Sequence, residues 1–171
     1  MRRENPRILA ARALGLVRQA LYSVRRAKWM LERRGTEEKG LLRYLEILEL
    51  TLERIALRLE TIATTGIMTP EMILLPRALI QEVSKMMSLP QVEPVLSEID
   101  LTLSALAELS QAEIPETMLT HVSEEARRIL REIEAELEKR GPVRTPSQAD
   151  SQARGAGRVA SGPQTEGPAK E

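Results

Sequence analysis

Apolar residues between positions 41 and 62 recur at alternating intervals of four and three, and this spacing constrains the fold more than any other feature of the sequence. The residues are Leu41, Leu45, Leu48, Leu52, Ile55, Leu59 and Ile62. A 4-3 repeat without a gap places every one of these side chains on one face of an α-helix. Because an apolar face of this length must be covered, we expect a partner helix to pack along it.

A looser version of the same pattern comes earlier in the chain, after Asn5 and Pro6, a pair typical of a helix start. The polar segment RGTEEKG, residues 34–40, separates the two patterns. Two helices joined by a short turn fold back on each other. We therefore predict an antiparallel hairpin over residues 6–63, with a core formed by Leu14, Val17, Leu21 and Val24 against Leu45, Leu48, Leu52, Ile55 and Leu59.

The composition favours a helical fold and excludes most classes of catalytic site. Aromatic residues make up only 2% of the chain, so the core must be aliphatic, which favours packed helices over a β-sandwich. The absence of cysteine excludes disulfides, thiolate metal sites and thiol catalysis. One histidine, His121, cannot build a multi-histidine metal site. We expect an all-α protein that is not an enzyme and has no catalytic, cofactor or metal site.

The remaining chain predicts shorter elements. Residues 70–110 contain proline-led helix starts, and we expect two shorter helices packed along the hairpin, completing a helical core over residues 1–110. These helices would cover a second apolar strip on the hairpin, made of Ile47, Leu50 and Leu57. Residues 111–122 are predicted to be a linker and residues 123–140 a C-terminal helix. Residues 141–171 are predicted to be a disordered tail, because they lack large apolar residues.

Charge is unevenly distributed, although the net charge is zero. Residues 1–34 contain ten Arg or Lys and two Glu, a net of +8, whereas residues 64–120 contain two basic and eight acidic residues, a net of −6. On a helix, one face would collect Arg7, Arg18, Arg25, Arg26 and Arg33. This face suits anionic lipid or nucleic acid. Nucleic acid is disfavoured because no nucleic-acid-binding fold or stacking aromatic residue accompanies the arginines.

Carboxylates on the second predicted helix are expected to form a solvated face rather than a metal site. They are Glu46, Glu49, Glu53 and Glu60.

Three segments resemble, in order, the archaeal ESCRT-III-like cell-division proteins of the CdvB group. LTLERIALRLETI, residues 50–62, is similar to the second helix of that family. SLPQVEPVLSEIDLTLSAL, residues 88–106, is similar to its fourth helix, and SEEARRILREIEAELEKR, residues 123–140, to its C-terminal helix. The resemblance implies a short paralogue with an ESCRT-III-like helical fold. It would be a membrane-associated, polymer-forming subunit of a cell-division or membrane-remodelling machinery, binding anionic lipid through its basic first helix.

The same resemblance implies partners and a location. The partners would be further copies of the chain and ESCRT-III-like paralogues, an anionic membrane surface, and an AAA ATPase with an MIT domain, reached directly or through a paralogue. No apolar run approaches the roughly 20 residues of a membrane-spanning helix. We expect a cytoplasmic protein, peripheral at the inner face of the cell membrane and at the division site. The alternative is a helical adaptor or nucleoid protein whose basic helix binds nucleic acid.

The predicted C-terminal helix has an apolar stripe that must be covered. We expect the helix to fold back on the hairpin, where it either restrains assembly or serves as a partner-binding helix. The residues that carry this role are Leu130, Ile133 and Leu137.

Overall fold

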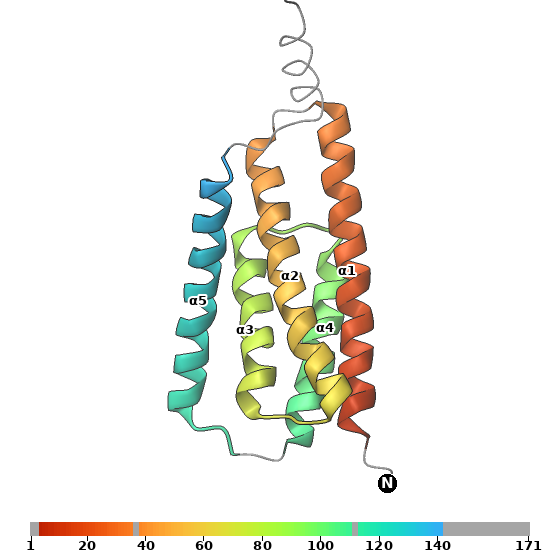
Figure 1. Cartoon of the computed structure of the whole chain (residues 1–171), viewed down its shortest axis with the longest axis vertical. Helices are drawn as coiled ribbons and strands as arrows, with labels where there is room; N and C mark the ends of the chain where they lie inside the picture. Colours follow the sequence, from red (N-terminus) through yellow and green to blue (C-terminus); the bar gives the residue numbers. More distant parts are fainter. Residues whose placement is uncertain (1–3, 36–37, 111–112, 142–171) are drawn as a thin grey trace, which may run out of the picture.

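The computed structural model describes residues 4–35, 38–110 and 113–141, and within these ranges it contains helices and no strand (Figure 1). This confirms the all-α prediction. The helices are α1 (Pro6–Arg34), α2 (Lys39–Thr65), α3 (Pro70–Met86), α4 (Glu93–Leu109) and α5 (Glu116–Lys139).

The first four helices form a closed up-down-up-down bundle. Each packs against its neighbour in the chain, and α4 returns to pack against α1 (Figure 1). Consequently α2 and α4 lie at opposite corners of the bundle, and α1 lies between them. The fifth helix, α5, packs outside this bundle against α3 and α2, and it runs in the same direction as α3. Helix α1 has 29 residues and therefore a length of about 43 Å.

Local signals in the sequence explain where the helices begin and end. The Asn5 side chain accepts a hydrogen bond from the Arg7 backbone N–H, and Pro6 occupies the first helical position. Helix α2 ends at Gly66, whose φ of 71° is left-handed and whose N–H bonds the Ile62 carbonyl. Thr69 caps α3 in the same way as Asn5 caps α1.

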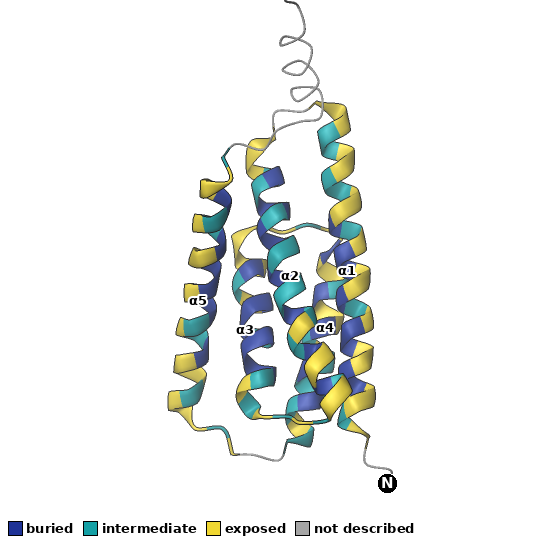
Figure 2. Cartoon of the chain, in the orientation of Figure 1, coloured by how far each residue is buried: buried dark blue, intermediate teal, exposed yellow. Residues whose placement is uncertain are grey.

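The hydrophobic core includes the predicted contact between the two hairpin helices. All nine residues predicted for that contact are buried, and together with apolar residues of α3, α4 and α5 they form one hydrophobic cluster (Figure 2). Two polar groups inside it are satisfied. The buried Thr51 hydroxyl donates to the Ile47 carbonyl over 2.7 Å, and the Tyr44 hydroxyl donates to the Val83 carbonyl over 3.2 Å, which ties α2 to α3.

The predicted linker over residues 111–122 is wrong in its second half, because α5 begins at Glu116 and not at Ser123. The Met118 and Leu119 N–H groups bond the Pro115 carbonyl, which starts the helix. Val122 is buried and Met118 packs against the core, so the apolar stripe of α5 extends one turn and a half toward its N-terminus. The connection between α4 and α5 is thus shorter than the sequence suggested.

The second apolar strip of α2 is covered only in part. Ile47 is buried and Leu50 is half-buried, but Leu57 has 66% of its surface exposed, against the expectation that a packed helix would cover it. The predicted disordered tail lies outside the described residues apart from Gly141.

Candidate functional site

Six side chains share the outward side of α1, opposite its buried residues, and we call this surface the arginine–aromatic face. On an ideal helix they fall within an arc of about 80°. Tyr22 and Trp29 are exposed over 67% and 55% of their surface. The face consists of Ile8, Arg18, Tyr22, Arg26, Trp29 and Arg33.

This face is positively charged without local compensation. Helix α1 has no acidic residue between Pro6 and Leu31. Among the described residues, neither Arg18 nor Arg26 forms an ion pair, and both are exposed. The Arg33 guanidinium lies 4.6 Å from the centre of the Trp29 ring, in a cation–π contact that leaves both groups at the surface. The surface therefore offers fixed positive charge next to large amphipathic rings.

Arg7, predicted to belong to the same basic face, is exposed and also bonds within the chain. Its guanidinium donates to the Thr65 carbonyl over 3.1 Å and so connects the start of α1 to the end of α2. It also lies over Gly66, where a Cβ would come within 2.7 Å of the Arg7 Nε. The Arg7 side chain therefore contacts the C-terminal end of α2.

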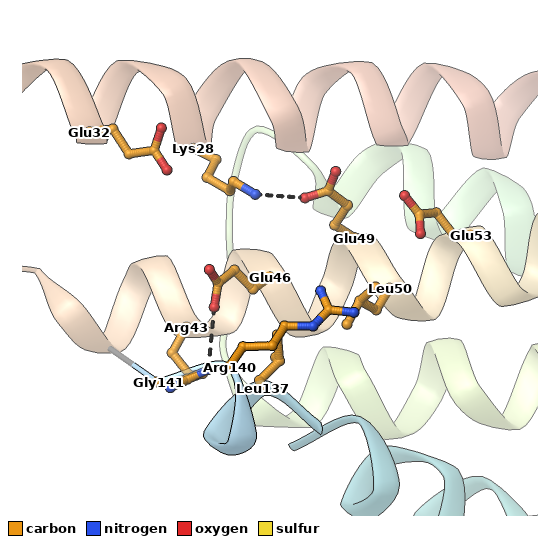
Figure 3. Close-up of a pocket in the computed structure, with 10 residues that line it drawn as sticks. All are labelled: Lys28, Glu32, Arg43, Glu46, Glu49, Leu50, Glu53, Leu137, Arg140 and Gly141. Atoms are coloured by element: carbon orange, nitrogen blue, oxygen red, sulfur yellow. Dashed lines mark hydrogen bonds and ion pairs between the residues drawn. The ribbon is translucent and has the colours of Figure 1, made fainter. Parts of the chain in front are cut away.

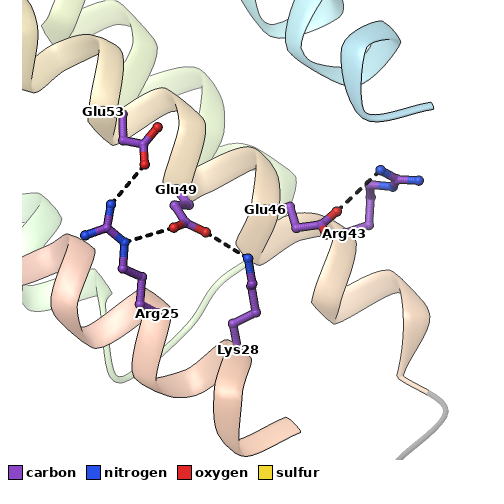
Figure 4. A network of polar contacts seen from close by, with 6 residues as sticks. All are labelled: Arg25, Lys28, Arg43, Glu46, Glu49 and Glu53. Atoms are coloured by element: carbon purple, nitrogen blue, oxygen red, sulfur yellow. Dashed lines mark hydrogen bonds and ion pairs between the residues drawn. The ribbon is translucent and has the colours of Figure 1, made fainter. Parts of the chain in front are cut away.

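Arg25, also predicted for the basic face, forms ion pairs within the chain while 54% of its side chain stays exposed. Its guanidinium bonds Glu49 and Glu53 of α2, each over 2.9 Å, and Lys28 bonds the other oxygen of Glu49 over 3.0 Å (Figure 4). Burial alone would raise the pKa of the Glu49 carboxyl, but hydrogen bonds from Arg25 and Lys28 outweigh burial and hold that pKa below its usual value. Glu49 and Glu53 therefore join α1 to α2, contrary to the expectation of a solvated carboxylate face.

A cleft of about 550 Å³ lies beside this network, between α1, α2 and the end of α5 (Figure 3). Its acidic wall includes Glu32, Glu46, Glu49 and Glu53, and its basic groups are Lys28, Arg43 and Arg140. All of these carboxylates except Glu32 are already in ion pairs within the chain. The lining holds four carboxylates against three basic groups, and all of these charges except that of Glu32 are paired within the described residues, which leaves little charge for a small ionic ligand.

The sequence reasoning missed the exposed aromatic residues. Ile8, Tyr22 and Trp29 stand at multiples of seven positions from one another, offset from the core stripe. From that spacing, the sequence could have predicted a row of exposed side chains along the first helix. The stated absence of stacking aromatic residues beside the arginines is therefore wrong, because Tyr22 and Trp29 lie among them on the surface.

The three residues named for the C-terminal helix, Leu130, Ile133 and Leu137, are buried where α5 packs on α3 and α2. Ion pairs frame this contact: Arg127 to Glu82 over 3.6 Å, and Arg54 to Glu132 over 4.0 Å. The helix is docked as expected, and its role in restraining assembly or binding a partner stays a prediction.

Searches of protein-family models, of curated proteins and of solved structures gave no match to this chain. Among the helices that the structure describes, none combines the length and the apolar character needed to cross a bilayer.

Proposed function

We propose that this protein binds anionic membrane surfaces through the arginine–aromatic face of α1. The observation that carries the proposal is the presence of two exposed aromatic rings on one side of α1, among arginines that form no ion pair with any residue the structure describes. Trp and Tyr side chains favour the interface between lipid headgroups and hydrocarbon, because one end of each ring is apolar and the other polar. Arginine extends its stem along apolar surface while its charge stays near lipid phosphates.

The magnitude of the electrostatic attraction is sufficient for reversible binding. Each basic residue near an anionic membrane contributes about 1 kcal/mol, so Arg18, Arg26 and Arg33 together supply about 3 kcal/mol. Insertion of Ile8, Tyr22 and Trp29 adds the burial of apolar surface at the headgroup boundary. The helix would lie in the plane of the membrane, with the bundle above it.

The wider proposal is that the chain is a subunit of an ESCRT-III-like machinery. It rests on the three sequence segments that resemble the CdvB group, at residues 50–62, 88–106 and 123–140. In this proposal the protein polymerises with its own copies or with paralogues at the division site, and an MIT-domain ATPase removes subunits.

Nucleic acid is the competing ligand, and one observation favours it. Exposed aromatic rings beside arginines can stack on unpaired bases. The lipid proposal is preferred because Ile8, Tyr22 and Trp29 lie along one line of a rigid helix, which suits a flat surface.

Cosedimentation with vesicles tests the proposal. Phosphatidylserine–phosphatidylcholine vesicles should bind the wild-type chain, and the double variant Arg18→Glu/Arg26→Glu should lose this binding. The matched control is Arg131→Glu/Lys139→Glu on α5, where both residues are exposed and unpaired among the described residues, so it changes net charge equally. It should bind like the wild type. Added salt should weaken binding, since the Debye length falls from about 10 Å at 0.1 M to about 3 Å at 1 M.

Equal binding to pure phosphatidylcholine vesicles, or full binding by the α1 variant, would contradict the proposal. Single-stranded DNA at matched salt provides the second arm. Binding to DNA without binding to anionic vesicles would replace the lipid proposal with the nucleic-acid one.

A further inference from the structure

The end of the α1–α2 hairpin has an apolar groove that is not part of the arginine–aromatic face. Both hairpin helices extend past the loop that joins α3 to α4 (Figure 1). A groove of about 280 Å³ lies between the last turns of α1, the first turns of α2 and this loop. Its apolar lining residues that keep accessible surface are Ala27, Met30, Leu31, Leu41, Leu89 and Pro90.

The groove opens from the hydrophobic core to the solvent. Leu45 and Val92, its deepest lining residues, are each 1% exposed and belong to the core. Met30 at the surface is 38% exposed. The groove exists because α1 and α2 continue where α3 and α4 have ended, so the apolar side of the hairpin is only partly covered there.

The groove has one positive charge. Among the described residues that line it, Arg34 is the only charged one, and its side chain is exposed. Arg34 forms no ion pair with any described residue. The described carboxylates closest to it in sequence do not line the groove: Glu38 precedes α2 and is exposed, and Glu32 lines the charged cleft of Figure 3.

The groove is continuous with the arginine–aromatic face through Met30. On a helix, residues three and four positions apart are neighbours on the surface. Two of these neighbours of Met30, Arg26 and Arg33, belong to the arginine–aromatic face. The other two, Ala27 and Arg34, line the groove. A membrane bound by that face would therefore lie next to the opening of the groove.

We propose that this groove binds one acyl chain of an anionic phospholipid, with Arg34 at the phosphate. The apolar lining suits the chain, and a guanidinium offers parallel N–H donors that match phosphate oxygens. The volume is close to the roughly 300 Å³ at which small-molecule sites begin, so the groove holds part of a single chain. The inference rests on the proposed function and adds to it a site for an individual lipid at the end of α1.

Two other occupants fit these observations less well. A second copy that met the first groove to groove would bring Arg33 and Arg34 of both copies together, and like charges oppose such a contact. An α-helix of a partner protein is about 10 Å wide with its side chains, which is more than this groove accommodates. A hydrocarbon chain is narrower and has no backbone polar groups that need hydrogen bonds.

Binding of soluble alkyl phosphates tests the inference on the full-length chain, with isotope-labelled methionine methyl groups observed by NMR. Met30 lines the groove, whereas Met72 and Met118 are in the first turns of α3 and α5, at the other end of the bundle (Figure 1). Dodecyl phosphate below its micelle concentration should shift the Met30 signal and leave Met72 and Met118 unchanged. Inorganic phosphate lacks the chain and dodecyl maltoside lacks the charge, so each should bind at least about tenfold more weakly.

Two variants remove the two halves of the site. Ala27→Phe fills the groove and Arg34→Glu reverses its charge, so each should weaken dodecyl phosphate binding at least about tenfold. The matched controls on α1 are Ala11→Phe and Arg12→Glu, at exposed residues outside the groove lining. Both should bind like the wild type. Thermal melts check that the variants fold, and because Arg34 is exposed, Arg34→Glu decides alone if Ala27→Phe unfolds.

An unshifted Met30 signal, equal affinity for dodecyl maltoside, or full binding by folded Ala27→Phe or Arg34→Glu would overturn the inference. A Met30 signal that moves with protein concentration alone would also overturn it, because a second copy would then occupy the groove. Vesicle cosedimentation separates the inference from the proposed function. Binding of dodecyl phosphate without binding to anionic vesicles supports the groove and counts against the proposed function. Vesicle binding with an unshifted Met30 signal overturns the groove and leaves the proposed function in place.

Discussion

Arg18 and Arg25 are seven residues apart on α1, yet among the described residues only Arg25 forms ion pairs. The difference is set by α2, which places Glu49 and Glu53 within 2.9 Å of the Arg25 guanidinium. Helical spacing correctly gave the side of α1 on which both arginines lie, but it could not show on which edge of that side α2 would pack. The sequence therefore predicted a basic face, and the structure adds that Arg25, at the edge nearest α2, is paired with Glu49 and Glu53.

Glu49→Gln should lower the free energy of unfolding by about 1–3 kcal/mol at neutral pH, because a half-buried carboxylate that accepts bonds from Arg25 and Lys28 loses its charge. The native pKa of Glu49 is lowered, so the wild-type advantage exists above the unfolded pKa and disappears as pH falls through the native pKa. Urea unfolding followed by circular dichroism at about pH 7 and about pH 3 should show the difference shrinking. Glu60→Gln, at an exposed residue, should have no effect; an equal loss in both variants would count against the network.

Two glycines on or next to the hairpin helices should respond to alanine with opposite signs. Gly66→Ala forces an L-residue into a φ of 71° and puts its Cβ against Arg7, so we expect a loss of about 1–3 kcal/mol. Gly15 is in the middle of α1 with open space around it, so Gly15→Ala should stabilise by about 0.5–1 kcal/mol. Thermal melts of the two variants would contradict this account if both shifts had the same sign.

At the scale of whole elements, the sequence predicted helices correctly where the apolar spacing was unbroken. The prediction was wrong where apolar residues were mixed with turn-forming residues. The 4-3 repeat of α2 and the Asn5–Pro6 start of α1 gave the hairpin, since these signals act within a single helix. The start of α5 was missed because Pro115, Thr117 and Thr120 look like a linker. The i, i+4 pair Met118 and Val122 continues the stripe of Ala126 and was the signal for helix. The packing of α1 to α4 into a four-helix bundle depends on contacts between distant segments, which local spacing does not encode.

Because α5 begins at Glu116, we expect the buried Val122 side chain to contribute to the stability of the fold. Val122→Asp would place a charge at a site with 3% exposure, at a cost of about 3 kcal/mol or more. His121→Asp, one residue earlier on the exposed side, should change stability little. Chemical denaturation of the two variants measures the difference, and similar midpoints for both would restore the linker interpretation of residues 111–122.

For the whole molecule, the important property is the separation of its surfaces. The bundle buries one aliphatic core and leaves two distinct outer surfaces: the arginine–aromatic face on α1 and the acidic α4. The separation explains why a chain with zero net charge can still present a strongly basic surface.

The central claim is that the arginine–aromatic face enters the lipid interface, and Trp29 reports on it directly. It is the only tryptophan in the chain, and 55% of its surface is exposed, so its emission comes from this face alone. Titration with phosphatidylserine-containing vesicles should shift the emission to shorter wavelength and protect Trp29 from acrylamide quenching. Phosphatidylcholine vesicles, or the Arg18→Glu/Arg26→Glu variant, should show neither change. An unchanged Trp29 spectrum and unchanged quenching on vesicles that do sediment the protein would show that another surface binds lipid, and would contradict the account.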